Sequence, residues 1–272
     1  MNKTKMYVIT ETSEFMMSYV IVTGEGNCII IDGGRPADIP LLKEKVKGRK
    51  IKAWFLTHPH LDHITAFNHI VKNGDPDFDF EKVYYNFPTE EYAATTNIGA
   101  CENDLTTLKE FNAILPRIQD KTQIVRTGDV FRIDNVKVEI LYHFEERYNF
   151  KCKDINETSI AFRLSTDNAS VMFLGDLGPE GGDILVEQGE EKLKADYCQM
   201  AHHGHAGVSS DVYMLINPKT CIWNAKLQWL INEEGRLLAY RRYGFKRTWL
   251  WMERLGVKEH ILTRDGTAEI EL

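Results

Sequence analysis

Six of the nine histidines of this chain fall in two short runs, and the first of these runs constrains the fold most. It reads His58-Pro59-His60-Leu61-Asp62-His63 and follows residues 51–56, an apolar stretch typical of a buried strand. A single histidine is usually a packed or solvated side chain. Four imidazole and carboxylate groups on one strand-to-helix turn are instead the ligands that zinc and similar ions prefer, and they can serve two metals. The run therefore predicts an enzyme with a metal site.

Length, charge and cysteine content exclude several classes of protein. The 272 residues carry a formal net charge of −7, which disfavours a dedicated nucleic-acid binder. We expect one domain over residues 1–272. No segment is apolar enough for a signal peptide or a membrane span, so we expect a cytoplasmic protein that does not contact membranes. The five cysteines are scattered and fit reduced, mostly buried thiols.

Strands and helices are predicted to alternate along the chain, which favours α/β layers. The expected strands cover residues 7–10, 18–22, 28–31, 51–56, 83–86, 159–164, 170–174, 195–200 and 220–223. Residues 130–133 and 136–141 predict a hairpin around Asp134-Asn135, and residues 260–263 and 268–271 predict a closing hairpin. Helices are expected near residues 40–46, from Ile64 onward, over 103–115 and near 183–189.

Several of the expected strands end in a residue of metal-binding type. Asp32, His58, Asp176 and His202 each stand at such an end. Because the corresponding ends of strands in layered sheets meet at one edge, these side chains are expected to converge. Asp176, after Gly175, is the natural bridging carboxylate, although alone it would read as a turn or N-cap aspartate.

The order His-x-His-x-Asp-His, Gly-Asp and a late histidine resembles the metallo-β-lactamase superfamily, over essentially the whole chain. Within it, three motifs are similar to the branch that contains the hydrolase-like domain of bacterial competence DNA-uptake proteins: Asn156-Glu157-Thr158-Ser159, His202-His203-Gly204 and Thr263-Arg264-Asp265-Gly266. The resemblance implies an α/β fold, the αββα four-layer sandwich, with two mixed β-sheets packed face to face and helices outside.

The resemblance also implies roles for individual residues. His58 and His60 would bind a first metal, Asp62, His63 and His202 a second, and Asp176 both. The expected cofactors are two divalent ions, zinc first, with manganese or iron as alternatives. Three further positions have open roles. Asn156, or less favourably His143, stands in for the middle histidine of most members as a weak ligand, and His203 either replaces His202 or faces the substrate. Asp32 is either a turn aspartate or a carboxylate that orients the metal loop. We expect Asp62 and His203 to act in catalysis, and His205 to be a solvated loop residue.

Two metals about 3.5–4 Å apart can hold a bridging hydroxide that attacks an electrophilic centre. The resemblance favours a small phosphodiester or phosphoester substrate, with a lactone or other carboxylic ester as the alternative. A nuclease is supported by the basic and aromatic residues of 236–254, although amphipathic helices against a sheet explain that segment better. A metal-poor scaffold or interaction module is the non-enzyme alternative. A di-iron redox enzyme would need more carboxylates and a flavin partner domain, and no flavin-binding segment is present.

Overall fold

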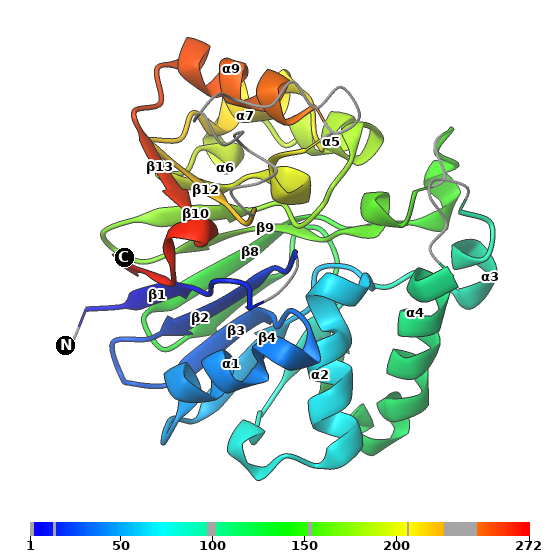
Figure 1. The fold of residues 1–272 in the computed structure, drawn as a ribbon. Coiled ribbons are helices and arrows are strands. Elements are labelled where there is room, and N and C mark those ends of the chain that lie inside the picture. Colours follow the sequence, from blue (N-terminus) through cyan, green and yellow to red (C-terminus); the bar gives the residue numbers. More distant parts are fainter. Residues whose placement is uncertain (1–2, 13–14, 97–101, 152–153, 206, 226–243) are drawn as a thin grey trace.

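The computed structural model describes residues 3–12, 15–96, 102–151, 154–205, 207–225 and 244–272 (Figure 1). Two seven-stranded mixed sheets pack against each other, and helices cover their outer faces. This is the αββα four-layer sandwich predicted from the sequence. Among the described residues, no helix is both long enough and apolar enough to cross a membrane.

The first sheet contains the histidine-bearing strand. Its strand order is β14-β1-β2-β3-β4-β5-β6, and the run from β3 to β6 is parallel. The strands are β1 (Lys5–Val8), β2 (Ser18–Val22), β3 (Cys28–Asp32), β4 (Ile51–Phe55), β5 (Val83–Tyr85), β6 (Thr122–Ile124) and β14 (Ala268–Glu271).

The second sheet has the order β13-β12-β11-β10-β9-β8-β7, and the run from β10 to β13 is parallel. The strands are β7 (Val130–Ile133), β8 (Val136–Tyr142), β9 (Ala161–Ser165), β10 (Ser170–Phe173), β11 (Tyr197–Gln199), β12 (Thr220–Trp223) and β13 (Glu259–Leu262). The expected hairpin at Asp134 is confirmed, since β7 and β8 pair antiparallel on either side of it.

The expected closing hairpin is wrong, although both of its strands exist. β13 pairs with β12 in the second sheet, whereas β14 pairs with β1 in the first. Between them, a 3₁₀ turn over Thr263–Asp265 and Gly266, whose φ is +109°, carry the chain from one sheet to the other. The local pattern indicates two strands and a turn, but each strand finds its hydrogen-bond partner in a different layer.

The helices bury one face each against the sheets. Against the first sheet lie α1 (Ile39–Val46), α2 (Leu61–Asn73) and α4 (Glu102–Ile114), and against the second lie α5 (Pro179–Val186), α7 (Ser210–Ile216) and α9 (Phe245–Leu255). The short helices α3 (Glu90–Ala93) and α6 (Glu190–Leu193) complete the described set. Cys28, Cys198 and Cys221 are buried free thiols, as expected, while Cys101 and Cys152 lie outside the described residues.

Strand β4 shows how an apolar run positions the metal loop in the sandwich. Ala53 and Phe55 face the core between the sheets, while Trp54 and Leu56 pack against the helices. Because successive side chains of a strand point to opposite faces, an unbroken apolar run is what a strand buried on both sides requires. The chain then leaves this rigid strand directly into the first histidine run.

Candidate metal centre

The candidate ligands meet where the carboxyl ends of parallel strands from both sheets come together. The first histidine run follows β4, and His60 is the N-cap residue of α2. Asp176 follows β10, and the second histidine run follows β11 in a 3₁₀ turn over Ala201–Gly204. The expected convergence at one edge is thus present, with one set of side chains from each sheet.

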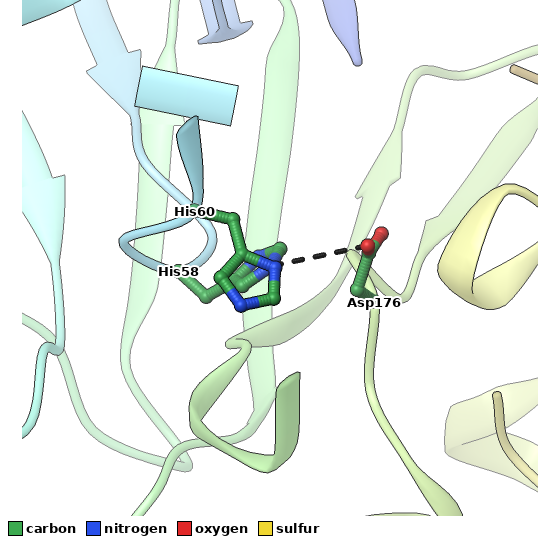
Figure 2. A group of neighbouring side chains, drawn as sticks. All are labelled: His58, His60 and Asp176. Carbon is green, nitrogen blue, oxygen red and sulfur yellow. Dashed lines mark ion pairs between the residues drawn. The ribbon is translucent and has the colours of Figure 1, made fainter. Parts of the chain in front are cut away.

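A first group of possible ligands contains His58, His60 and Asp176, whose ligand atoms all lie within 4.8 Å of one another. Figure 2 shows both rings beside the Asp176 carboxylate. The Nε2 atom of His58 is 3.9 Å from Asp176 Oδ2, and its Nδ1 is 3.1 Å from Thr57 Oγ1. A divalent ion fits this spacing, since two imidazoles and a carboxylate are a common zinc donor set.

A second group contains Asp62, His63 and His203, whose ligand atoms also lie within 4.8 Å of one another. His63 Nε2 is 3.3 Å from Asp176 Oδ1, and His203 Nε2 is 3.4 Å from Asp176 Oδ2. Asp176 therefore faces both groups, in the position expected for a bridging carboxylate.

Buried polar atoms that make no hydrogen bond provide a further test of the fit to metal. Nε2 of His58, His63 and His203 and Oδ1 of Asp176 are all buried, and none makes a hydrogen bond within the described part of the chain. These atoms face one another at ion-pair distances, such as 3.3 Å between His63 Nε2 and Asp176 Oδ1. Since a buried polar atom without a hydrogen bond is costly, such a cluster calls for a further bonding partner. The residues present fit a pair of divalent ions.

Opposite charges alternate through the centre. Burial lowers the pKa of His63, but the carboxylates of Asp176, Asp32 and Asp62 outweigh it and raise that pKa well above its ordinary value. Burial raises the pKa of Asp176, but His203 and His63 hold it well below the usual range. Burial, together with His63 and His60, lowers the pKa of His58. The centre therefore concentrates negative charge on Asp62 and Asp176, where a cation would be held.

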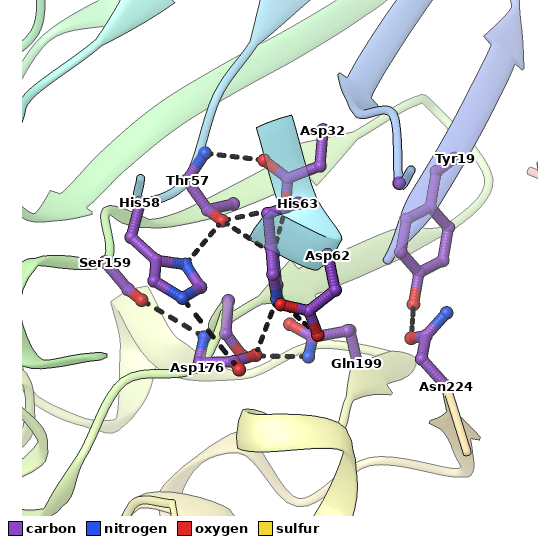
Figure 3. Close-up of polar contacts among 12 residues, drawn as sticks. Tyr19, Asp32, Thr57, His58, Asp62, His63, Ser159, Asp176, Gln199 and Asn224 are labelled. Carbon is purple, nitrogen blue, oxygen red and sulfur yellow. Dashed lines mark hydrogen bonds and ion pairs between the residues drawn. The ribbon is translucent and has the colours of Figure 1, made fainter. Parts of the chain in front are cut away.

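Asp32 lies behind His63 rather than in either ligand group. The side chain is fully buried and accepts hydrogen bonds from the Thr57 amide at 2.7 Å and the Thr57 hydroxyl at 2.8 Å (Figure 3). His63 Nδ1 is 2.7 Å from Asp32 Oδ2. The sequence left Asp32 as either a turn aspartate or a carboxylate that orients the metal loop. The geometry fits the second interpretation, because the contact with Nδ1 leaves Nε2 of His63 directed at the ligand groups.

The Asp176 turn is held by two residues whose role the sequence reasoning missed. Gly175 has φ +55°. The buried Gln199 side chain donates to the Gly175 carbonyl at 3.0 Å and accepts from the Leu174 amide at 2.8 Å. Ser159 Oγ accepts from the Asp176 amide at 3.1 Å. Ser159 belongs to a motif noted in the sequence, but nothing in the spacing around Gln199 distinguishes it from an ordinary core residue.

The geometry favours His203 over His202 as the late histidine. His203, not His202, lies in the second ligand group; its Nδ1 is 2.8 Å from the Asn224 carbonyl, and Nε2 faces Asp62 at 3.1 Å. His202 belongs to neither group, although its Nε2 is 4.0 Å from Asp176 Oδ2 and its side chain is 28% exposed. Both residues have left-handed backbones, with φ of +51° and +56°. In this conformation the imidazole of His203 points into the centre, and that of His202 lies at its open side.

Of the two alternatives for the middle ligand, His143 lies outside both groups. Asn156 is buried and its Oδ1 has no hydrogen-bond partner among the described residues. His143 is engaged elsewhere, since its Nδ1 accepts from the Thr127 amide at 3.1 Å and its Nε2 is 3.5 Å from Glu145. His143 thus has other partners, and Asn156 as a weak ligand stays a prediction.

His205 is not the solvated loop residue expected from the sequence. It is 6% exposed and packs between the rings of Phe15 and Phe245. Burial, followed by the neighbouring His202 and His203, lowers the pKa of His205 to about 3. His205 is buried because α9 covers this loop, and Thr248 of α9 donates a hydrogen bond to the His205 carbonyl at 3.2 Å.

Only the second half of the basic and aromatic segment is described, because residues 226–243 lie outside the described ranges. In α9, Phe245 is buried and Trp249 stacks on His260 at 4.3 Å between ring centroids. Arg247 lies over the Trp251 ring at 5.1 Å. This half fits an amphipathic helix with aromatic residues against the sheet.

Comparisons with known proteins agree with the geometry. Residues 15–100, which carry the first histidine run, match the family model for the metallo-beta-lactamase superfamily. The metallo-β-lactamase fold protein YhfI from Bacillus subtilis is 11% identical with a TM-score of 0.58, covering 99% of this chain and 100% of that one. A diphosphatase from the PhnP family is 14% identical with a TM-score of 0.52, covering 98% of each chain.

CmlA, a diiron β-hydroxylase from Streptomyces venezuelae, is 11% identical with a TM-score of 0.58, covering 100% of this chain and 55% of that one. No curated protein sequence matches the chain. The resemblance to the metallo-β-lactamase superfamily is thereby confirmed, and so is its sandwich fold, while the competence-type branch stays a prediction. Identities this low show the fold alone, and the fold serves hydrolytic and oxidative chemistry alike.

Proposed function

We propose that this chain is a metal-dependent hydrolase that holds two divalent ions, zinc first, and cleaves a small phosphodiester or phosphoester. The observation that carries the proposal is the position of Asp176 between two ligand groups, His58 with His60 and Asp62 with His63 and His203. Two ions bound there would supply Lewis acidity and a water of lowered pKa.

The residues of the chain have distinct tasks in this proposal. Asp176 would hold both ions from the buried end of the centre and offset part of their positive charge. Asp62 is partly accessible, with a side chain 15% exposed, so its carboxylate can also accept a hydrogen bond from the attacking water and orient it. His203, expected in catalysis, is better placed as a ligand. His202, at the open side, is then the imidazole that contacts the substrate oxygens.

The substrate class rests on the sequence motifs rather than on the fold. The resemblance to the competence-type branch through Asn156, Ser159 and the His202-His203-Gly204 run favours a phosphoester over a lactone or carboxylic ester. The proposed nuclease activity has less support, since the described part of its basic and aromatic segment packs aromatic residues against the sheet.

Elemental analysis of the purified protein tests the metal centre. We expect about two equivalents of metal, with loss in Asp176→Ala and His60→Ala and retention in His202→Ala. His69→Ala is the matched control, because His69 is an exposed histidine on the same α2 helix. Metal that is substoichiometric and survives Asp176→Ala would favour the scaffold alternative.

Activity assays then separate the substrate classes. The probes are bis(p-nitrophenyl) phosphate for phosphodiesters, p-nitrophenyl phosphate for monoesters and γ-butyrolactone for lactones. We expect hydrolysis of a phosphate probe that falls strongly in His202→Ala while the metal content stays unchanged. Hydrolysis of the lactone probe alone would replace the phosphoester assignment.

A further inference from the structure

The late ligand His203 is oriented differently from His58 and His63. Nδ1 of His58 is next to the Thr57 hydroxyl, and Nδ1 of His63 is next to the Asp32 carboxylate. Nδ1 of His203 instead faces a main-chain carbonyl, that of Asn224, at 2.8 Å. Because a carbonyl only accepts, Nδ1 of His203 must carry a proton, which leaves Nε2 free to bind a cation.

Asn224 follows directly on β12 and is itself held by a residue of the other sheet. Its side chain is 1% exposed, and its Oδ1 accepts a hydrogen bond from the hydroxyl of Tyr19, the second residue of β2 (Figure 3). Its Nδ2 has no hydrogen-bond partner among the described residues. Within the described chain, the bond from Tyr19 is thus the hydrogen bond that fixes the Asn224 side chain.

The phenol of Tyr19 is rigidly placed. It is fully buried, and its ring packs edge-on against Phe173 of β10 at 5.0 Å between centroids. Phe173 lies on the strand that leads to Asp176. Burial raises the pKa of Tyr19 well above its ordinary value, so the hydroxyl keeps its proton and donates.

We infer that Tyr19 is a positioning residue for the second metal site: through Asn224, it fixes the tautomer and orientation of His203 across the two sheets. This inference rests on the proposed function for its consequence, metal affinity, but the tether is a property of the protein itself. Tyr19 touches neither ligand group and acts through two hydrogen bonds in series.

Tyr19→Phe tests the tether by removing only the hydroxyl. In a competition of zinc against a chromophoric chelator, we expect the affinity of the second ion to fall about 10- to 100-fold while the first ion is retained. Asn224→Leu should do the same, and the double variant should be no worse than either single variant, because both break one path. Tyr84→Phe is the matched control, since Tyr84 is a buried tyrosine of the same inter-sheet core whose ring packs on Phe55 and Phe131.

A second readout does not depend on metal. In chelator-treated protein, the Nδ1 proton of His203, observed by NMR of ¹⁵N-histidine-labelled protein, should exchange with solvent faster in Tyr19→Phe than in the wild type. Unchanged exchange in a folded Tyr19→Phe protein would overturn the inference. If the wild type binds no metal but the Nδ1 proton still exchanges faster in Tyr19→Phe, the proposed function is refuted and the tether stands.

Discussion

Single side chains around Asp32 decide how well the centre could hold a metal. Asp32 accepts from both the amide and the hydroxyl of Thr57 and lies 2.7 Å from Nδ1 of His63. One carboxylate therefore fixes the start of the histidine run and the direction of a ligand ring. The backbone of Asp32 has φ +54°, an uncommon conformation outside glycine that persists where the surroundings impose it.

We predict that Asp32→Asn weakens metal binding about 10- to 100-fold, because an amide cannot accept from both Thr57 and His63 as the carboxylate does. Chelator competition on the purified variant measures the change. Asp134→Asn is the control, since Asp134 also has a left-handed backbone, at φ +53°, and accepts side-chain hydrogen bonds from Thr23 and Asn27 in a distant turn. Equal affinity in Asp32→Asn and wild type would show that Asp32 is only a turn residue.

Sequence predicts the ligands better than it predicts the residues that hold them. His58, His60, Asp62 and His63 were predictable because they are close together in one run after a strand. The choice between His202 and His203 was not, since it depends on backbone angles that spacing does not encode. Tyr19 and Gln199 act on the centre from strands β2 and β11 through hydrogen bonds that only the fold brings together. In the sequence, each looks like an ordinary residue of an apolar strand.

At the level of elements, the turn after β11 is tightly constrained. Gly204 has φ +90°, and a Cβ atom there would lie 2.3 Å from the Trp223 ring. His203 precedes it directly, so the close packing of Gly204 on β12 sets where the imidazole lies. The turn thus needs glycine for both its backbone angle and its lack of a side chain.

We predict that Gly204→Ala lowers the free energy of unfolding by about 2–4 kcal/mol, the sum of backbone strain and overpacking. Denaturant unfolding of metal-free protein gives the value. Gly256→Ala separates the two causes, because Gly256 has φ +80° but a Cβ atom there would meet nothing within 4 Å, so only the strain of about 1–2 kcal/mol should appear. Similar losses in both variants would mean that the Trp223 contact is readily relieved.

Asp196 links the start of three strands in the second sheet. Its carboxylate accepts from the Ser170 amide and hydroxyl, both at 2.9 Å, and from Lys219 at 2.7 Å. Burial alone would raise the pKa of Asp196, but Lys219 and Ser170 together lower it. A carboxylate whose pKa is lower in the folded than in the unfolded state stabilises the fold at neutral pH, and this contribution is lost as the pH falls through the folded-state pKa.

We therefore predict that Asp196→Asn destabilises the protein by about 1 kcal/mol at pH 7, a value kept small because the side chain is partly exposed. The difference from wild type should shrink as the pH falls below the ordinary aspartate range. Urea unfolding at several pH values measures it. A difference that stays constant down to low pH would assign the effect to lost hydrogen-bond geometry rather than to charge.

Pairing between elements was harder to predict than the elements themselves. The periodicity of residues 260–263 and 268–271 correctly indicated two strands, but a hairpin was wrong because Gly266 and the turn before it send the chain to the other sheet. The apolar periodicity of a strand indicates which of its side chains are buried. It does not indicate which strand is its hydrogen-bond partner, because the same side chains are buried in either sheet.

For the molecule as a whole, the centre joins the two halves of the sandwich through polar groups. His58, His60, Asp62 and His63 come from the first sheet, while Asp176 and His203 come from the second. Apolar contacts in the core between the sheets are non-directional, whereas an ion bound by residues of both sheets would fix their relative position at one point. Metal that binds the folded chain and not the unfolded chain stabilises it by mass action.

We predict that chelator treatment lowers the thermal unfolding midpoint and that each tenfold increase in free zinc above saturation raises stability by about 1.4 kcal/mol per bound ion, or about 2.8 kcal/mol when both ion sites are filled. Differential scanning fluorimetry over a buffered zinc series measures this slope. Asp176→Asn should abolish most of it, because both ligand groups lose the carboxylate they share, whereas Asp196→Asn should keep the slope from a lower starting midpoint. A midpoint that does not respond to zinc in the wild type would contradict a metal centre spanning the sheets, since an ion held by both halves cannot bind without stabilising their union.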